Sequence, residues 1–417
     1  MKKSVGVILA ACAFVCAAEA FTVKDVTAAQ RWPWNGVLDV DFTIDGAAAG
    51  DLFRVEVVAK YADGEKKLCG RSYVSEPLCG RGRNRVSWDV RADYPDLKLA
   101  DVQVAVSAHP VNVDACDVYM VIDLSSGPNS PRYPVHYTFT PPVLVPTNDL
   151  VACAKDPNRT TKMWLKRIKR NVFPFYGTTN SNKGEGIFKV ELSPYYIGIF
   201  ELTQKQWALV MNDWPSAFTN VTYRDARPCS NINYIDVIGH QRWPENRAVS
   251  EESFVGRMRA RTGLSTFNLP TESQWECACR AGDKGSYHTS VCRGKSTSGT
   301  VVDFNEGPDI GTALVGSYKS NSWGIYDYYG NVMEMCLDAH ASNEALVELY
   351  AGQNPVVDPV GPPVNATERY HATRGGSYYN SADYCNNYSR SYNNRSATTG
   401  KRDNGVGARF VVSPEWK

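Results

Sequence analysis

The segment most informative about the fold is Leu269-Pro-Thr-Glu-Ser-Gln-Trp-Glu-Cys-Ala-Cys-Arg-Ala-Gly282. It predicts a helix because Thr271 can cap the N-terminus, Glu272 places a negative charge in the first turn, and Gly282 follows the last turn. Turns separate this helix from the few other regular elements expected downstream of residue 164. We therefore expect a loop-rich domain with few strands and a few helices over residues 164–417.

Two more helices are expected in the same region. Thr203-Gln-Lys-Gln206 fits a capping box and is followed by apolar residues, so it predicts a helix start. A further helix is predicted at residues 250–261.

Residues 21–145 are expected to be all-β. Six short apolar or alternating runs are separated by Gly, Pro, Asp and Asn: 37–44, 52–61, 85–90, 100–108, 119–124 and 133–139. This spacing favours an immunoglobulin-like or fibronectin-like sandwich. The proline-rich segment 141–146 is stiff, and residues 146–163 are predicted to be a linker.

Residues 1–20 resemble a secretory signal peptide. Lys2 and Lys3 precede an apolar stretch that ends in Ala18-Glu19-Ala20, a pattern typical of a cleavage site. The mature protein is thus predicted to be exported to the periplasm or the cell exterior. A lipoprotein anchored through Cys12 is the less favoured alternative.

Charge and hydropathy exclude some classes of protein. Lys and Arg total 45 against 44 Asp and Glu, so there is no net field to attract nucleic acid or an anionic membrane. No segment after the signal approaches the ~18 apolar residues that a membrane span needs. We therefore predict neither a nucleic-acid binder nor a transmembrane protein.

Ten of the 12 cysteines lie outside the predicted signal, and an exported chain can oxidise them. Cys69 and Cys79 flank a turn-like stretch and could bridge a hairpin. Cys277 and Cys279 are more simply explained as buried apolar residues.

An acidic cluster is found in Asp327-Tyr-Tyr-Gly330-Asn-Val332-Met-Glu334. Two carboxylates seven residues apart, with a Gly-Asn turn between them, can surround one hard cation with carboxylate and carbonyl oxygens, as calcium requires. The alternative is a plain tight turn with two exposed acids, and the spacing alone does not separate the two.

A second cluster is Arg374-Gly-Gly-Ser377-Tyr-Tyr-Asn380-Ser-Ala-Asp-Tyr384-Cys385, followed by a run of Asn, Tyr, Ser and Arg to residue 395. Cys385 could be a nucleophile or a thiolate ligand, although a buried or disulfide-bonded cysteine is the simpler interpretation because no base or second ligand is nearby in the sequence. The amides, hydroxyls and tyrosines after it suit either a peptide or glycan site or an exposed loop.

Taken in order, these segments resemble the sulfatase-modifying-factor domain, the family of the formylglycine-generating enzyme. The resemblance extends from about Lys166 to Val412 and includes the opening block Tyr195–Trp207, the segment 269–282 and Arg374-Gly-Gly-Ser377. The remaining blocks are Pro228 with residues 231–234, Asn321–Asp327 leading into the acidic cluster, and Gly407-Ala-Arg409-Phe410.

The resemblance implies a C-type-lectin-like α+β fold following the all-β domain. It also implies calcium, bound through the side chains of Asp327 and Glu334 and the carbonyls of Gly330 and Val332. The enzymes of the family bind copper(I) between two thiolates five residues apart and oxidise a substrate cysteine to formylglycine. Cys385 matches the second of these thiolates.

Tyr384 and Ser377 match residues that line the family's active site, but Asn380 stands where the first thiolate is needed. A neutral amide is a poor ligand for copper(I), which is a soft ion. We thus favour an exported, non-catalytic member that uses a calcium-braced cleft to bind a peptide, a sulfatase or a glycan. One alternative is an active oxidase with Cys336 or Cys292 as a substitute ligand; another is a structural module that displays a surface.

Overall fold

The computed structural model of the chain describes residues 21–31, 36–48, 50–60, 67–96, 103–175, 186–239, 243–244, 247–283, 311–362, 370–380, 384–392 and 402–413. The predicted signal peptide lies outside these residues. The chain divides into two compact units, Met1–Val121 with Pro134–Pro141 and Ile122–Tyr133 with Pro142–Lys417. Each unit is described by itself.

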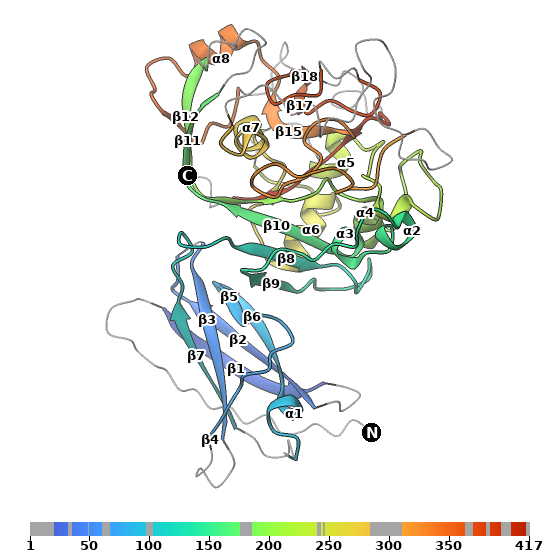
Figure 1. Ribbon diagram of the computed structural model, residues 1–417. Helices are drawn as coiled ribbons and strands as arrows, with labels where there is room; N and C mark the ends of the chain where they lie inside the picture. Colours follow the sequence, from blue (N-terminus) through green and yellow to red (C-terminus); the bar gives the residue numbers. More distant parts are fainter. Residues whose placement is uncertain are drawn as a thin grey trace. The chain divides into compact units, whose positions relative to one another are not determined.

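The first unit is built from β-strands, as the sequence predicts. Its elements are β1 (Thr22–Gln30), β2 (Val37–Asp45), β3 (Leu52–Lys60), β4 (Lys67–Cys69), β5 (Leu78–Gly80), β6 (Gly82–Asp89), α1 (Val90–Asp93), β7 (Gln103–Pro110) and β9 (Val135–Thr138), while β8 (Tyr119–Asp123) leads into the second unit. One sheet has the order β1-β2-β6; in the other, β3 pairs with β7 along one edge and with β4 and β5 along the other (Figure 1).

Buried side chains from both sheets form a single apolar core in this unit. Along β2, buried residues alternate with more exposed ones, because successive side chains of a strand point to opposite faces. Val40, Val55 and Trp88 are completely buried in the core. Strands account for most of the regular structure of this unit, which also contains the short helix α1, and an all-β, immunoglobulin-like class remains a prediction.

The suggested disulfide between Cys69 and Cys79 is wrong, because both thiols are free. Cys69 lies opposite Val58 and Cys79 lies opposite Phe53 on the same edge of β3. Five residues along a strand correspond to roughly 17 Å, well beyond the ~7 Å Cα separation that a disulfide tolerates.

The second unit combines short helices with small mixed sheets. Its elements are α2 (Leu150–Cys153), α3 (Pro157–Thr160), β10 (Lys162–Ile168), β11 (Asn171–Phe175), β12 (Phe188–Leu192), β13 (Tyr195–Gly198), α4 (Gln204–Met211), η2 (Arg224–Ala226), α5 (Tyr234–Ile238), α6 (Phe254–Thr262), β14 (Phe267–Asn268), α7 (Glu272–Arg280), β15 (Met333–Ala339), α8 (Asn343–Leu349), β16 (Val356–Val357), β17 (His371–Arg374), β18 (Arg390–Tyr392), β19 (Val406–Gly407) and β20 (Val411–Val412).

Three groups of strands are arranged around the helix α7. Their orders are β14-β20-β13-β10, β11-β12-β16 and β18-β17-β15-β19. Helix α7 contacts strands of the last two groups (Figure 1), and Trp275 on this helix is completely buried. Parallel and antiparallel pairs occur together, which is the α+β organisation that the sequence predicts.

The predicted helix boundaries are close to those observed. Thr203 and Thr271 both form capping boxes, in which the threonine accepts a hydrogen bond from the backbone N–H three residues on. Helix α7 ends at Ala281, whose φ of 49° is left-handed, and Gly282 follows with a φ of 84°.

The predicted linker, residues 146–163, is instead part of the second unit. It contains α2 and α3, and Cys153 belongs to a small apolar cluster with Ala226 and Leu314. The Arg159 side chain is buried and donates hydrogen bonds to Asp156 and to the carbonyl of Val315. The linker prediction, which relied on proline stiffness alone, was therefore wrong, because tertiary packing holds this segment in place.

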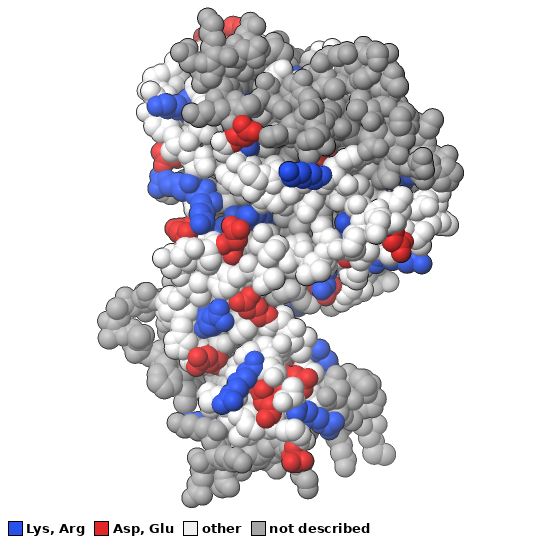
Figure 2. Space-filling model, viewed as in Figure 1, with Lys and Arg blue, Asp and Glu red and all other residues white. Residues whose placement is uncertain are grey.

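Opposite charges are interspersed on the visible described surface of the first unit (Figure 2). Lys24 pairs with Asp45, and Arg85 pairs with Asp41. Among the described residues, no helix is both long and apolar enough to cross a lipid bilayer.

Candidate functional site

Helix α7 supplies the ionic framework of the site. Glu272, in its first turn, accepts hydrogen bonds from Arg374 on β17 and two more from Arg390 on β18. Glu276, one turn later, accepts a hydrogen bond of 2.7 Å from Arg374 and another from Arg280. All five side chains are almost completely removed from solvent. The framework thus joins the helix to two strands.

The ion pairs and the burial of the framework also shift the pKa values of two carboxyl groups. Burial opposes the charge of Glu272, but the Arg390 and Arg374 guanidinium groups outweigh burial and lower its pKa to about 2. Asp338, on β15, accepts a hydrogen bond from the backbone N–H of Glu272. Burial, together with the charge of Glu272, raises the pKa of Asp338 to about 8.

The predicted calcium ligands lie in a buried cluster of acids. Glu334 binds the guanidinium of Arg409 through both carboxylate oxygens and also accepts a hydrogen bond of 2.7 Å from the Trp275 indole. The Oδ2 atom of Asp327 accepts a hydrogen bond from the backbone N–H of Gly316. Its Oδ1 atom is buried and has no hydrogen-bond partner among the described residues.

Glu201 is a third acid in this cluster, and it was not singled out as a site residue from the sequence. Its carboxylate accepts hydrogen bonds from the Asn331 side chain and from the backbone N–H of Val332. It occurs in the conspicuous Tyr195–Trp207 segment, but only the tertiary structure brings it beside the Gly-Asn turn.

The acid cluster has more negative than positive charge. Burial, followed by the charges of Asp327 and Glu334, raises the pKa of Glu201 well above its usual range. Burial also raises the pKa of Asp327 to about 6, whereas Arg409 opposes the shift. Buried carboxylates of this kind must take up protons or acquire a cation.

The fit to calcium is partial. The free oxygen of Asp327 and the surplus of carboxylates favour a cation. Against this, Arg409 already holds Glu334, and in the described part of the chain no three His, Cys, Asp or Glu side chains are placed to hold a metal ion.

Asn380 is oriented by its own turn. Its Oδ1 atom accepts hydrogen bonds from the Ser377 backbone N–H at 2.9 Å and from the Ser377 hydroxyl at 2.7 Å. Ser377 itself is completely buried, and Asn380 is half-buried. An amide therefore stabilises the turn at the position where the resemblance requires a thiolate.

Cys385 is also completely buried. Its sulfur contacts the Ser377 carbonyl at 3.8 Å, and a Cβ at Gly376 would come within 2.7 Å of this sulfur. Gly376 has a φ of 72°, so both its conformation and this close approach require glycine. Tyr384, by contrast, is 63% exposed. The structure thus places Ser377, Asn380 and Cys385 together and directs little of the thiol to solvent.

Of the two proposed substitutes for the missing thiolate, the structure disfavours Cys336. Cys336 is completely buried on β15, and burial raises its pKa well above the usual range, which disfavours a thiolate. Cys292 lies outside the described residues.

A cavity of about 340 Å³ lies beside this turn. It is lined by Met333, Thr373, Arg374, Gly375, Gly376, Asn380, Tyr384, Tyr388, Ser389, Arg390 and Ser391. The lining joins the ends of β17 and β18 to the turn that follows the two glycines. From the sequence, Asn380 and Tyr384 were predicted to occupy site positions. That β18 borders the same cavity follows only from its pairing with β17.

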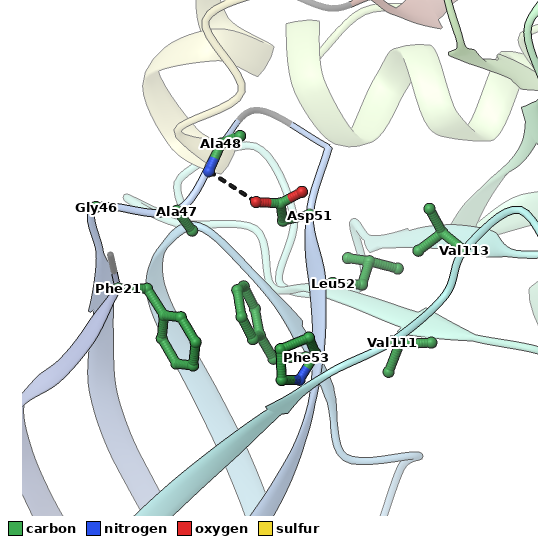
Figure 3. A pocket seen from close by; sticks show the side chains of 10 residues that line it. Phe21, Gly46, Ala47, Ala48, Asp51, Leu52, Phe53, Val111 and Val113 are labelled. Atoms are coloured by element: carbon green, nitrogen blue, oxygen red, sulfur yellow. Dashed lines mark hydrogen bonds between the residues drawn. The ribbon is translucent and has the colours of Figure 1, made fainter. Parts of the chain in front are cut away.

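The first unit has a separate cavity of about 280 Å³. Figure 3 shows the rings of Phe21 and Phe53 next to each other on one side of it, with centroids 4.5 Å apart. The carboxylate of Asp51, which lines this cavity, accepts a hydrogen bond from the backbone N–H of Ala48. The lining is otherwise apolar and offers no group for catalysis.

Comparison with known families gives one match that covers more than half of the chain. The family described as sulfatase-modifying factor enzyme 1-like domain matches residues 174–414. These residues contain the α7 framework, the acid cluster and the 340 Å³ cavity.

Curated relatives agree at modest identity. "Chaperone protein LppX" of Paenibacillus barcinonensis is 29% identical in an alignment of 227 residues, which covers 47% of this chain and 78% of that protein. The formylglycine-generating enzyme of Streptomyces coelicolor is 28% identical in an alignment of 200 residues, which covers 44% of this chain and 53% of the enzyme. This chain therefore spans about half the length of that enzyme.

Among solved structures, Treponema denticola variable protein 1 is 23% identical in sequence. The alignment covers 61% of this chain and 96% of that one, with a TM-score of 0.44. We draw no functional argument from this likeness.

Proposed function

The chain belongs to the sulfatase-modifying factor enzyme 1-like family, and from this premise we propose that it is a non-catalytic member that binds a ligand in the 340 Å³ cavity. The ligand class is a peptide, a sulfatase or a glycan. The observation that carries the proposal is Asn380, whose carbonyl oxygen is committed to Ser377. A second thiolate for copper(I) is thus missing where the chemistry needs it.

The burial of Cys385 supports the same conclusion. The side chain of Cys385 is completely removed from solvent, so a substrate or metal ion in solution does not reach its sulfur directly. The donor set among the described residues does not fit copper(I), and we derive no step through that ion.

Export is part of the proposal. It rests on the pattern of Lys2, Lys3 and Ala18-Glu19-Ala20 in the sequence, and lipid anchoring at Cys12 remains the less favoured form.

Copper(I) titration of the reduced chain, in competition with a chelator of known affinity, tests the non-catalytic assignment. We expect weak binding that is unchanged in Cys385→Ser. Tight one-to-one binding that is lost in Cys385→Ser would instead establish the second candidate function, an oxidase that converts a sulfatase cysteine to formylglycine. That candidate is kept because Cys385 occupies the family position of one ligand. Cys336→Ser is the informative companion variant, since equal loss there would identify the other ligand.

We also propose that calcium binds at the acid cluster through Asp327, Glu334 and the carbonyls of Gly330 and Val332. The free oxygen of Asp327 and the uncompensated carboxylate of Glu201 support this proposal. Such a cation would add positive charge to a cluster in which, among the described residues, three carboxyl groups share one ion-paired guanidinium, that of Arg409.

The calcium proposal predicts that Asp327→Asn lowers the melting temperature in calcium buffer but not in chelator. Glu334→Ala should lower it in both buffers, because that change also leaves Arg409 buried without its partner. The same melting temperature for the wild type with calcium and with chelator would rule out the site.

A further inference from the structure

We infer that the 340 Å³ cavity takes an uncharged saccharide, with one sugar ring in the cavity beside Tyr384 and the next against Tyr392 of β18. This inference rests on the proposed function, because it names the ligand class for the same cavity. It draws on three observations: the charge of the lining, its free hydrogen-bonding groups and its exposed rings.

Arg374 and Arg390, the charged side chains that line the cavity in the described part of the chain, are each paired with a buried carboxylate. Arg390 donates to both carboxylate oxygens of Glu272 and also to the Ala341 carbonyl and the Asn343 side chain. Arg374 donates to Glu272, to Glu276 and to the Asn387 carbonyl. No carboxylate lines the cavity among the described residues. A cationic ligand would therefore lose its hydration without meeting a carboxylate, and an anionic ligand would have to compete with Glu272 and Glu276 for the two guanidinium groups.

The remaining polar groups suit hydroxyl-rich ligands. The Oδ1 atom of Asn380 is held by Ser377, and its Nδ2 group has no hydrogen-bond partner among the described residues, so it can donate to a ligand. Ser389 and Ser391 add hydroxyl groups, which both donate and accept. Neutral donors and acceptors placed in this way orient a ligand without requiring charge on it.

Two exposed aromatic side chains lie at the cavity and on β18. Tyr384 lines the cavity and is 63% exposed, so its ring is accessible to a ligand in the cavity. Tyr392, next to the cavity-lining Ser391, is 44% exposed. Its ring stacks on Tyr370 at 5.2 Å and lies 4.7 Å from His340, so its orientation is fixed. Rigid aromatic surfaces contact a ligand at low cost in conformational entropy.

The size of the cavity agrees with this ligand class. Its volume is near the lower end of the ~300–1,000 Å³ range of small-molecule sites, so it holds a small unit rather than a folded segment. A peptide would be recognised through a charged terminus, a deep apolar pocket or an unpaired strand edge. Among the described residues, β18 is an edge strand of its sheet, so a peptide that adds a strand is the competing ligand class. A saccharide is favoured because the lining offers the Asn380 amide and the Ser389 and Ser391 hydroxyls beside exposed rings, and binding to glycan and peptide arrays decides between the classes.

The test presents the purified chain with two arrays in parallel. One carries neutral, sulfated and uronic-acid-containing oligosaccharides, and the other carries short peptides with and without cysteine. We expect binding to neutral glycans. Calorimetric titration with the best neutral disaccharide should show at least about tenfold weaker binding for Tyr384→Ala, while Tyr384→Phe keeps the ring and stays close to wild type. Tyr392→Ala should weaken the disaccharide more than the monosaccharide.

The outcomes separate this inference from the proposed function. Binding of sulfated or acidic glycans alone, or of peptides alone, overturns the saccharide inference. If only peptides bind and Tyr384→Ala abolishes their binding, the saccharide inference is wrong, but the proposed function of non-catalytic ligand binding in the cavity is supported. An absence of binding on both arrays overturns both. The melting temperature of each variant shows whether the fold is intact, and Tyr384→Phe supplies the comparison if Tyr384→Ala is unstable.

Discussion

Asn380 replaces a ligand that the family's enzymes need, and at the same time its side chain has a structural role. By family position it replaces a copper ligand. In the structure it accepts two hydrogen bonds from Ser377, which is completely buried. The replacement thus has a physical role of its own, because a buried N–H and hydroxyl would otherwise lack an acceptor.

At this scale we predict that Asn380→Ala lowers the free energy of unfolding by about 1–2 kcal/mol, the cost of leaving the Ser377 donors without an acceptor. Asn380→Asp is the matched control, since it keeps a carbonyl-type oxygen at the same place and should remain close to wild type. Urea denaturation at neutral pH measures the difference. Equal stability of Asn380→Ala and wild type would mean that the turn does not depend on this side chain.

Helix α7 shows how an element can organise a cavity that it does not itself line. Its first-turn acid, Glu272, binds Arg374 and Arg390, which belong to the two strands that border the cavity. The negative charge is also placed at the positive end of the helix dipole, where it is stabilised. The shape of the cavity wall therefore depends on a buried ionic contact with the helix.

We predict that Glu272→Gln destabilises the protein by about 3–5 kcal/mol, because it leaves buried guanidinium groups without a full counter-charge. Glu348→Gln, at an exposed position of α8, is the control and should change stability by less than about 0.5 kcal/mol. Chemical denaturation of the two variants side by side gives the comparison. A small effect for Glu272→Gln would show that solvent reaches the framework.

For the molecule as a whole, buried acids link stability to pH. The folded pKa of Asp338 is raised to about 8, above its ordinary value of 3.8. A group of this kind stabilises the fold fully at pH below its unfolded pKa, and the contribution is lost as the pH rises through the folded pKa. Asp327, with a pKa raised to about 6, acts in the same direction at lower pH. Glu272 acts oppositely, and its contribution is lost only as the pH falls toward about 2.

We therefore predict that the free energy of unfolding falls between about pH 6 and pH 8, by up to a few kcal/mol. Asp338→Asn keeps an oxygen that can accept the Glu272 N–H but cannot ionise, so it should flatten this part of the profile. Denaturant titrations across the pH range measure the slope. The same slope in wild type and Asp338→Asn would refute the assignment of the effect to Asp338.

The sequence predicts features that depend on residues close together along the chain better than features that depend on distant ones. The caps at Thr203 and Thr271 and the alternation along β2 were predictable because each depends on residues a few positions apart. The family followed from several ordered segments. The linker at 146–163 and the disulfide between Cys69 and Cys79 were mispredicted, because composition and proximity in sequence do not reveal packing or strand register.

The sequence by itself thus determined the α+β class of the second unit, the strands of the first, the family and the replacement of a cysteine by Asn380. Only the tertiary structure decided what the site residues contact. Arg409 reaches Glu334 across 75 positions, and Glu201 meets Asn331 across 130. Such pairs form because burial forces each charge or polar group to find a partner within the packed core. That requirement acts on neighbours in space, which local sequence patterns do not encode.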